Sequence, residues 1–170
     1  MNVLKNLAVK FTCGLLVSFL FSFVDARAEV LIGKVVGITD GDTITVLDGN
    51  KTQHKIRLMG IDAPEKKQEF GNESKKALSN YIYQKEVTVD YKKQDRYKRI
   101  VGKVLLGKQD ICLQMVKDGM AWHYKDYEKE QSKTDRELYR EAEAKARELK
   151  VGLWHQADAI KPSEFRSSHK

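Results

Sequence analysis

Hydrophobic and β-branched residues alternate with polar ones in short runs from residue 30 to about residue 106, and turn-forming residues separate the runs. This pattern is typical of β-strands that bury one face. The first three runs are separated by Asp40-Gly41 and Asp48-Gly49-Asn50, which predicts three strands joined by tight turns. Two further strands are expected at 87–89 and 100–106. The pattern therefore predicts five strands.

Helical spacing of apolar residues occurs in three other segments. Each begins at a candidate capping residue, namely Asn72, Asp110 and Ser132. The second segment stops at Gly119 and the third ends near Gly152, where glycine favours a helix terminus. The apolar face of the third helix is expected to consist of Leu138, Ala142, Ala146 and Leu149.

The order of these elements indicates a fold class. Five strands with a helix inserted between the third and the fourth match the OB-fold, a small and partly open barrel whose face often binds oligonucleotides. The sequence therefore predicts a mainly β or α+β domain, built as a five-stranded OB-fold β-barrel with three helices. Fold alone does not give function.

The N-terminal segment has the features of an export signal. Lys5 and Lys10 precede an apolar run at 11–24, and Ala26-Arg27-Ala28 follows as a cleavage site. The run is shorter than the roughly 20 residues that a membrane-spanning helix needs, so a signal peptide at 1–28 is favoured over a retained anchor. The protein is therefore expected to be secreted or periplasmic, without membrane attachment after cleavage.

Removal of the signal peptide would leave one domain at 29–155 and a polar C-terminal tail at 156–170 whose end is expected to be frayed. The net charge would fall from +7 to +5, because 1–28 holds three basic residues and one acidic residue. A basic chain favours polyanions without identifying one. Cys112 would be the remaining cysteine, which excludes an intramolecular disulfide, and we expect it to be buried and unreactive.

Five charged residues carry the candidate chemistry. They are Asp42, Arg57, Asp62, Glu65 and Arg99. Carboxylate oxygens bind hard divalent cations, and arginine matches the oxygens of a phosphodiester. Two aspartates and a backbone carbonyl would leave water to complete the shell of one calcium ion, with a dissociation constant of roughly 10⁻⁴ to 10⁻³ M. The set predicts a metal-assisted phosphodiesterase centre, whereas the histidines lack the spacing of a zinc site and are expected at surface or edge positions.

Several short motifs occur in a recognisable order along this strand pattern. They are Asp40-Gly41-Asp42-Thr43, Arg57-Leu58, Ile61-Asp62-Ala63-Pro64-Glu65, Asp95-Arg96-Tyr97-Lys98-Arg99, Gly119-Met120-Ala121 and Gly152-Leu153-Trp154. In this order they resemble the staphylococcal nuclease (thermonuclease) family over roughly residues 30–155. The resemblance implies a calcium-dependent OB-fold nuclease that cuts DNA and RNA and leaves 3′-phosphate ends.

The resemblance also implies roles for the central residues. Asp42 and Asp62 match the metal carboxylates, and Ala63 matches the position that gives a backbone carbonyl to the ion. Arg57 and Arg99 match the arginines that grip the scissile phosphate. Glu65 matches the general base for the attacking water, although it could instead only position that water.

Four further residues are implied for substrate binding. Arg96 and Tyr97 resemble positions near the neighbouring phosphate, and Tyr124 with Tyr127 resembles the aromatic wall beside a base. Two features depart from the family. Lys98 stands where relatives commonly have glycine, and the loop after Glu65 is short.

The expected partners are DNA and RNA as substrates, bound by a monomer without a protein partner. The alternative is a non-catalytic OB-fold module that binds nucleic acid. Such a binder does not need all five charged residues together, and their joint presence favours the enzyme.

Overall fold

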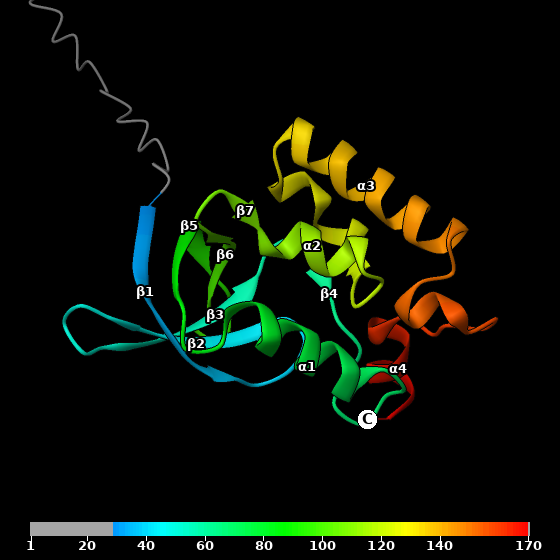
Figure 1. Ribbon diagram of the computed structural model, residues 1–170, viewed down its shortest axis with the longest axis horizontal. Coiled ribbons are helices and arrows are strands. Elements are labelled where there is room, and N and C mark those ends of the chain that lie inside the picture. The colour runs from blue at the N-terminus through cyan, green and yellow to red at the C-terminus, as the bar shows by residue number, and fades with distance from the viewer. Residues whose placement is uncertain (1–28, 170) are drawn as a thin grey trace, which may run out of the picture.

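Five strands close into a barrel in this structure, a computed structural model that describes residues 29–169 (Figure 1). The barrel strands are β1 (Glu29–Ile38), β2 (Thr43–Asp48), β3 (Gln53–Leu58), β5 (Glu86–Gln94) and β6 (Ile100–Leu106). They follow the order β3-β2-β1-β5-β6, and a parallel pairing of β3 with β6 closes the ring. The predicted OB-fold barrel is therefore confirmed, while the signal peptide predicted at 1–28 lies outside the described residues.

Short strands extend this framework, and the first of them holds Ile61 and Asp62, which were expected at the end of the third strand but are separate from β3. The short strands are β4 (Ile61–Asp62), β7 (Gln109–Asp110) and β8 (Trp122–His123). β4 pairs with β8, with Asp62 opposite Trp122. This pairing ties the segment that follows β3 to a distant part of the chain, and it holds Asp62 in place.

The barrel interior is filled by the apolar residues that alternate along the strands. Ile44 and Val46 of β2 and Val87 and Val89 of β5 are almost fully buried. Cys112 is buried within the same core, and burial raises the pKa of its thiol to about 12. The expectation that Cys112 is structural is confirmed, because a buried neutral thiol is a poor nucleophile.

The three predicted helices are present. They are α1 (Gly71–Ile82), α2 (Ile111–Lys117) and α3 (Lys133–Glu148). α1 and α2 pack on the barrel, whereas α3 packs mainly on α2 rather than on the barrel as expected. Asp110 and Ser132 cap α2 and α3 by accepting hydrogen bonds from Leu113 N and Asp135 N. α1 instead begins one residue before Asn72, and its capping position is taken by Phe70 in a left-handed conformation. Two 3-10 helices, η1 (Lys125–Glu130) and η2 (Gly152–His155), flank α3 in sequence.

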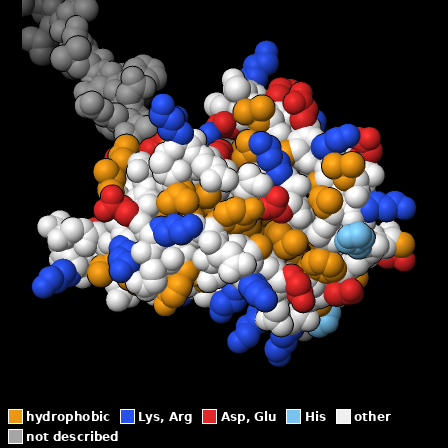
Figure 2. Space-filling view, viewed as in Figure 1, with side chains coloured by type: hydrophobic (Ala, Val, Ile, Leu, Met, Phe, Trp, Pro, Cys, Tyr) orange, Lys and Arg blue, Asp and Glu red, His pale blue; other side chains and the backbone are white. Residues whose placement is uncertain are grey.

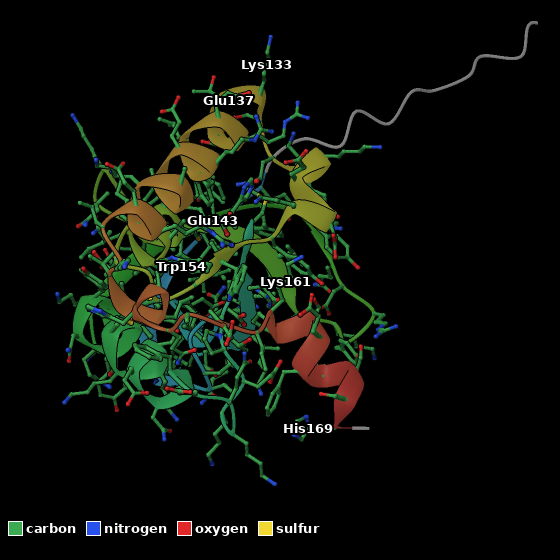
Figure 3. The ribbon with its side chains drawn as sticks, turned by 90° about the vertical axis from the view of Figure 1, so that its right-hand side faces the viewer. Lys133, Glu137, Glu143, Trp154, Lys161 and His169 are labelled. Carbon is green, nitrogen blue, oxygen red and sulfur yellow. The ribbon has the colours of Figure 1, made fainter. Side chains whose placement is uncertain are left out.

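The buried face of α3 agrees with the predicted one at Ala142 and Ala146 but differs at its two leucines. Leu138 and Leu149 are 43% and 58% exposed, whereas Tyr139 and Glu143 are buried. The Tyr139 hydroxyl donates to Asp110, and Glu143 accepts from Lys125 at 2.7 Å. In Figure 3, Glu143 points from α3 toward the barrel. The inward face of α3 therefore includes Tyr139 and Glu143 in place of the two leucines. The helical spacing of apolar residues alone does not reveal this.

The C-terminal segment is also more ordered than the frayed tail expected from its polarity. Pro162 begins a helix, α4 (Pro162–Ser168), and is itself buried. Proline suits this position because its fixed φ matches a helix and its missing N–H is not needed in the first turn. α4 lies beside β4 and the start of α1 (Figure 1). The expectation of fraying is therefore wrong for this stretch.

The charge of the described surface is mixed. On the face shown in Figure 2, lysine and arginine side chains are spread around the rim with acidic side chains among them. No helix within residues 29–169 combines the length and apolar composition that crossing a membrane requires.

Candidate active site

A cleft of about 640 Å³ opens beside the closure of the barrel. All residues predicted for the site line it except Asp62, which is 2% exposed and reaches the cleft through its ion pairs. The lining members are Asp42, Arg57, Ala63, Glu65, Arg96, Tyr97, Arg99, Tyr124 and Tyr127. The structure thus brings the predicted residues together, and their individual roles stay predictions.

Arg57 lies at the centre of the site because of its place in the barrel. It is opposite Thr43 on β2 and opposite Val101 on β6, where β3 closes the ring. Its Nη1 donates to the carbonyls of Leu58 and Ile61, both at 2.8 Å. Two backbone carbonyls therefore hold the guanidinium in one orientation without the help of a ligand.

The other terminal nitrogen of Arg57 joins the two predicted metal carboxylates. Nη2 lies 3.1 Å from Oδ2 of Asp42 and 3.0 Å from Oδ1 of Asp62. Asp42 is further held by Ala63 N at 2.9 Å and by the Thr43 hydroxyl at 3.0 Å. Charge-assisted hydrogen bonds of this kind fix geometry strongly. The carboxylates of Asp42 and Asp62 thus converge on one point.

Gly41 permits this convergence. A Cβ at position 41 would lie 1.9 Å from the Ser74 hydroxyl oxygen and 2.7 Å from Cβ of Ala63. Both distances are shorter than atoms tolerate, so any side chain there would push α1 and Ala63 away from Asp42. The glycine is needed for close approach as well as for the turn that the sequence indicated.

The electrostatics of the cluster favour an added cation. Burial raises the pKa of Asp62, and Asp42 adds to the rise, while Arg166 and Arg57 oppose it. Burial and the charge of Asp42 also raise the pKa of Asp40 to about 6. The raised pKa of Asp62 means that burial disfavours its ionised form more than the two arginines favour it, so a further cation beside it would stabilise the charge.

The residues present fit one hard cation. Asp42 and Asp62 supply convergent carboxylate oxygens, and Ala63 lies beside them. Within residues 29–169 no group of three or more histidine, cysteine, aspartate or glutamate side chains is arranged to hold a metal. The donor set is therefore the small one that the sequence indicated, and it would depend on water for the remaining positions.

Arg99 lines the cleft from the loop between β5 and β6. Its Nε donates to Asp95 at 2.7 Å, and its Nη1 lies 3.4 Å from the Thr43 hydroxyl, which in turn donates to Asp42. Burial works against the charge of Asp95, but hydrogen bonds from Arg99 and Tyr97 lower its pKa overall. Asp95 therefore positions Arg99.

Lys98 takes a left-handed conformation with φ of 62°. Glycine adopts this conformation readily, whereas a side chain with a Cβ adopts it at a steric cost. The loop accommodates lysine without losing the turn, since Asp95 accepts hydrogen bonds from the backbone N–H groups of Tyr97 and Arg99. The left-handed conformation costs strain at Lys98 while Arg99 stays in the cleft.

Aromatic rings line the cleft near both arginines. The rings of Tyr124 and Tyr127 lie 4.8 Å apart, and the Arg57 guanidinium is 5.9 Å from the Tyr124 ring. Tyr97 is 64% exposed, with the guanidiniums of Arg96 and Arg99 at 4.8 and 5.5 Å from its ring. Exposed aromatic rings beside guanidiniums are typical of sites that bind single-stranded nucleic acid, because bases stack on the rings and phosphates pair with the positive charge.

Arg166 is the site residue that sequence reasoning missed. Its Nη1 donates to Glu65 at 2.8 Å and to Oδ1 of Asp62 at 3.2 Å, and its Nη2 donates to Oδ2 of Asp62 at 3.0 Å. These contacts join residues more than 100 positions apart, and α4 carries no motif. The one signal in the sequence is a basic residue in a short segment that begins with proline.

Comparison with known proteins agrees with this geometry. A family model described as staphylococcal nuclease homologue matches residues 55–156. An uncharacterized endonuclease from Haemophilus influenzae is 44% identical over 137 residues, covering 81% of this chain and 74% of its own. A micrococcal nuclease from Shigella flexneri is 40% identical over 147 residues, covering 81% and 82% of the two chains. An uncharacterized endonuclease from Escherichia coli is 41% identical over 152 residues, covering 89% and 94%.

Proposed function

Because the chain belongs to the staphylococcal nuclease family, we propose that this nuclease is an exported, calcium-dependent phosphodiesterase that hydrolyses both DNA and RNA. The observation that carries the proposal is the convergence of Asp42, Asp62 and Arg57 in a cleft that Arg99 and Glu65 also line. Few chemistries other than phosphodiester cleavage need carboxylates for a cation and two arginines for an anion at one place.

The proposed cofactor is one calcium ion. Asp42 and Asp62 would hold it together with the carbonyl of Ala63, and its chemistry there would be to offset negative charge on the scissile phosphate. Support comes from the burial of both aspartates and from the raised pKa of Asp62. The small donor set argues for affinity in the range of roughly 10⁻⁴ to 10⁻³ M, which suits an exported enzyme.

The proposed catalytic groups of the protein are Arg57, Arg99 and Glu65. The arginines would bind the equatorial oxygens of the phosphate as negative charge builds there, and a group of this kind contributes about 3 to 4 kcal/mol. Arg57 is suited to the task because the protein already fixes its orientation. The Glu65 carboxylate would take a proton from the attacking water or position that water, and it is partly exposed at the cleft.

Substrate binding would use the aromatic residues. Tyr124 and Tyr127 form a wall near Arg57 on which a base could stack, while Arg96 and Tyr97 flank Arg99 where a neighbouring phosphate would lie. Stacking tolerates any base, and none of these contacts requires or excludes a 2′-hydroxyl. This supports cleavage of both DNA and RNA.

End-group analysis of the products tests the proposal. The purified protein is incubated with a DNA and an RNA oligonucleotide in calcium, and with calcium plus excess chelator. We expect 3′-phosphate and 5′-hydroxyl ends from both substrates in calcium and intact substrate with chelator. Tight binding of single strands without cleavage would instead support the alternative, a non-catalytic OB-fold binding module.

A further inference from the structure

The last helix of the described chain carries an arginine that forms ion pairs with carboxylates on which the proposed reaction depends. α4 runs between Lys161 and His169, which are labelled in Figure 3, and its residue Arg166 lines the cleft. Before α4, the side chain of Gln68 donates to the carbonyl of Ile160 at 2.7 Å. This hydrogen bond and the burial of Pro162 bring the helix to the loop that follows β4.

Arg166 engages Asp62 with both terminal nitrogens. Nη1 and Nη2 bind Oδ1 and Oδ2 at 3.2 and 3.0 Å, which is the bidentate geometry that guanidinium and carboxylate prefer. Arg57 shares Oδ1, so both oxygens of Asp62 are occupied. A second carboxylate, that of Glu65, accepts from Nη1 at 2.8 Å. Arg166 therefore neutralises one predicted cation ligand and the proposed water-activating group together.

We propose that Arg166 is an internal competitor for the divalent cation, one that must leave Asp62 before a cation can bind and that therefore raises the cation concentration which the enzyme requires. This inference rests on the proposed cation site. Arg166 and Arg57 together donate three hydrogen bonds to the Asp62 carboxylate, which leaves little of its lone-pair capacity for a calcium ion. Repulsion between the guanidinium and the cation at that distance adds to the competition. By linkage, the free energy required to break the ion pairs of Arg166 is subtracted from the free energy of cation binding.

The attachment of α4 allows such a release. The helix has seven residues, and the side chain of Arg166 is 40% exposed even while it is paired. The ring of Phe165 stacks on His169, within the same C-terminal segment, at 4.0 Å between centroids. Besides the burial of Pro162 and the hydrogen bond between Gln68 and Ile160, the ion pairs of Arg166 hold the helix in position, and a cation at Asp62 would weaken that hold.

Calorimetric titration of calcium into protein free of nucleic acid tests the inference without any cleavage step. Arg166→Gln removes the competitor, while Lys161→Gln removes the same charge from an exposed side chain at the start of the same segment. We expect the Arg166→Gln variant to bind calcium about tenfold more tightly than the wild type, and the Lys161→Gln variant to stay within about twofold of it. Affinity in Arg166→Gln that is no higher than in Lys161→Gln would overturn the inference.

This design separates two failures. If the wild type cleaves nucleic acid in calcium but the Arg166→Gln variant binds calcium no more tightly, the competitor role is wrong and the proposed function stands. If none of the variants binds calcium and the wild type does not cleave, both proposals fail.

Limited digestion with trypsin tests the movement of α4 directly. The peptide bond after Arg166 should be protected while the side chain is paired, and calcium should raise its cleavage rate about fivefold or more, because proteolysis follows the population of the open form. The bond after Arg140, whose side chain is 48% exposed on α3, serves as the internal reference. An unchanged ratio of the two rates would contradict release.

Discussion

Arg57 places its Nη2 atom 3.0 Å from Oδ1 of Asp62, so the arginine proposed to hold the phosphate is itself held by a carboxylate proposed to hold the cation. The two roles are coupled in the structure. The side chain of Arg57 is 12% exposed and that of Asp62 is 4% exposed, so their pairing is shielded from solvent. A change at Arg57 should therefore affect stability as well as catalysis.

Arg57→Ala and Arg99→Ala should separate these two effects. Each variant should lose cleavage rate by roughly 10²-fold or more, because each removes a positive group aimed at the phosphate. Arg57→Ala should also lower the free energy of unfolding by about 1 to 3 kcal/mol, since it leaves buried carboxylates short of a partner. Arg99 is more exposed and pairs with Asp95, so its loss should cost less than about 1 kcal/mol. Urea unfolding and single-turnover rates measure the two quantities, and equal destabilisation would refute the coupling.

Glu65→Gln keeps the shape of the side chain and removes its charge. We expect the cleavage rate to fall roughly a hundredfold or more, since general-base catalysis contributes about 10² to 10⁴. Glu69→Gln is the matched control, because Glu69 is an exposed glutamate on the same loop. The measurement is the initial rate of cleavage at saturating calcium. A Glu65→Gln rate near that of the control would show that Glu65 has no catalytic role.

Lys98→Gly should relieve the left-handed strain of the Arg99 loop. We expect the free energy of unfolding to stay level or rise by up to about 1 kcal/mol, because glycine adopts this backbone conformation without the steric cost of a Cβ. Lys92→Gly, within strand β5, should instead destabilise by about 0.5 to 1 kcal/mol. Thermal or urea unfolding compares the two variants, and equal losses would show that position 98 carries no strain.

Asp95→Asn should make the free energy of unfolding less dependent on pH in the acidic range. The folded-state pKa of Asp95 lies below 3.8, so its charge contributes stability that is present above the unfolded pKa and is lost as pH falls through the folded pKa. At pH 7 the variant should therefore be less stable than the wild type, by about 1 kcal/mol or less because the pair with Arg99 is near the surface. The difference should shrink as the pH falls below about 4. Unfolding curves at pH 7 and pH 3 measure it, and a constant difference would exclude the charge of Asp95 as the cause.

Much of the barrel and of the site followed from the sequence. Alternation along the strands predicted the barrel, because each strand buries one face, and turn residues placed Asp42 at a strand end. The parallel pairing of β3 with β6, which places Arg57 at the centre of the site, depends on tertiary packing and leaves no local signal in the sequence.

The position of His123 also depends on tertiary packing that the sequence does not reveal. This histidine was expected at the surface or an edge, but it is buried and bonded to Gln131, because β8 pairs with β4 there.

The part of the site that sequence reasoning missed lies in α4. Its seven residues are too few for a hydrophobic period to stand out, and short helices form through tertiary packing more than through propensity. The ion pairs of Arg166 with Asp62 and Glu65 link the segment around β4 to the C-terminal end of the described chain. Pairings of charged groups over such a separation are set by the fold, so an isolated arginine in a polar tail gives no indication of them.

The central proposal is that the cleft is a calcium-dependent phosphodiesterase site. It is tested most directly by the initial rate of cleavage of one DNA and one RNA oligonucleotide as a function of free calcium. We predict a saturable rise for both substrates, with a midpoint of roughly 10⁻⁴ to 10⁻³ M, and its loss in Asp42→Asn. Cleavage that proceeds unchanged in excess chelator, or no cleavage of either substrate at any calcium concentration, would contradict it.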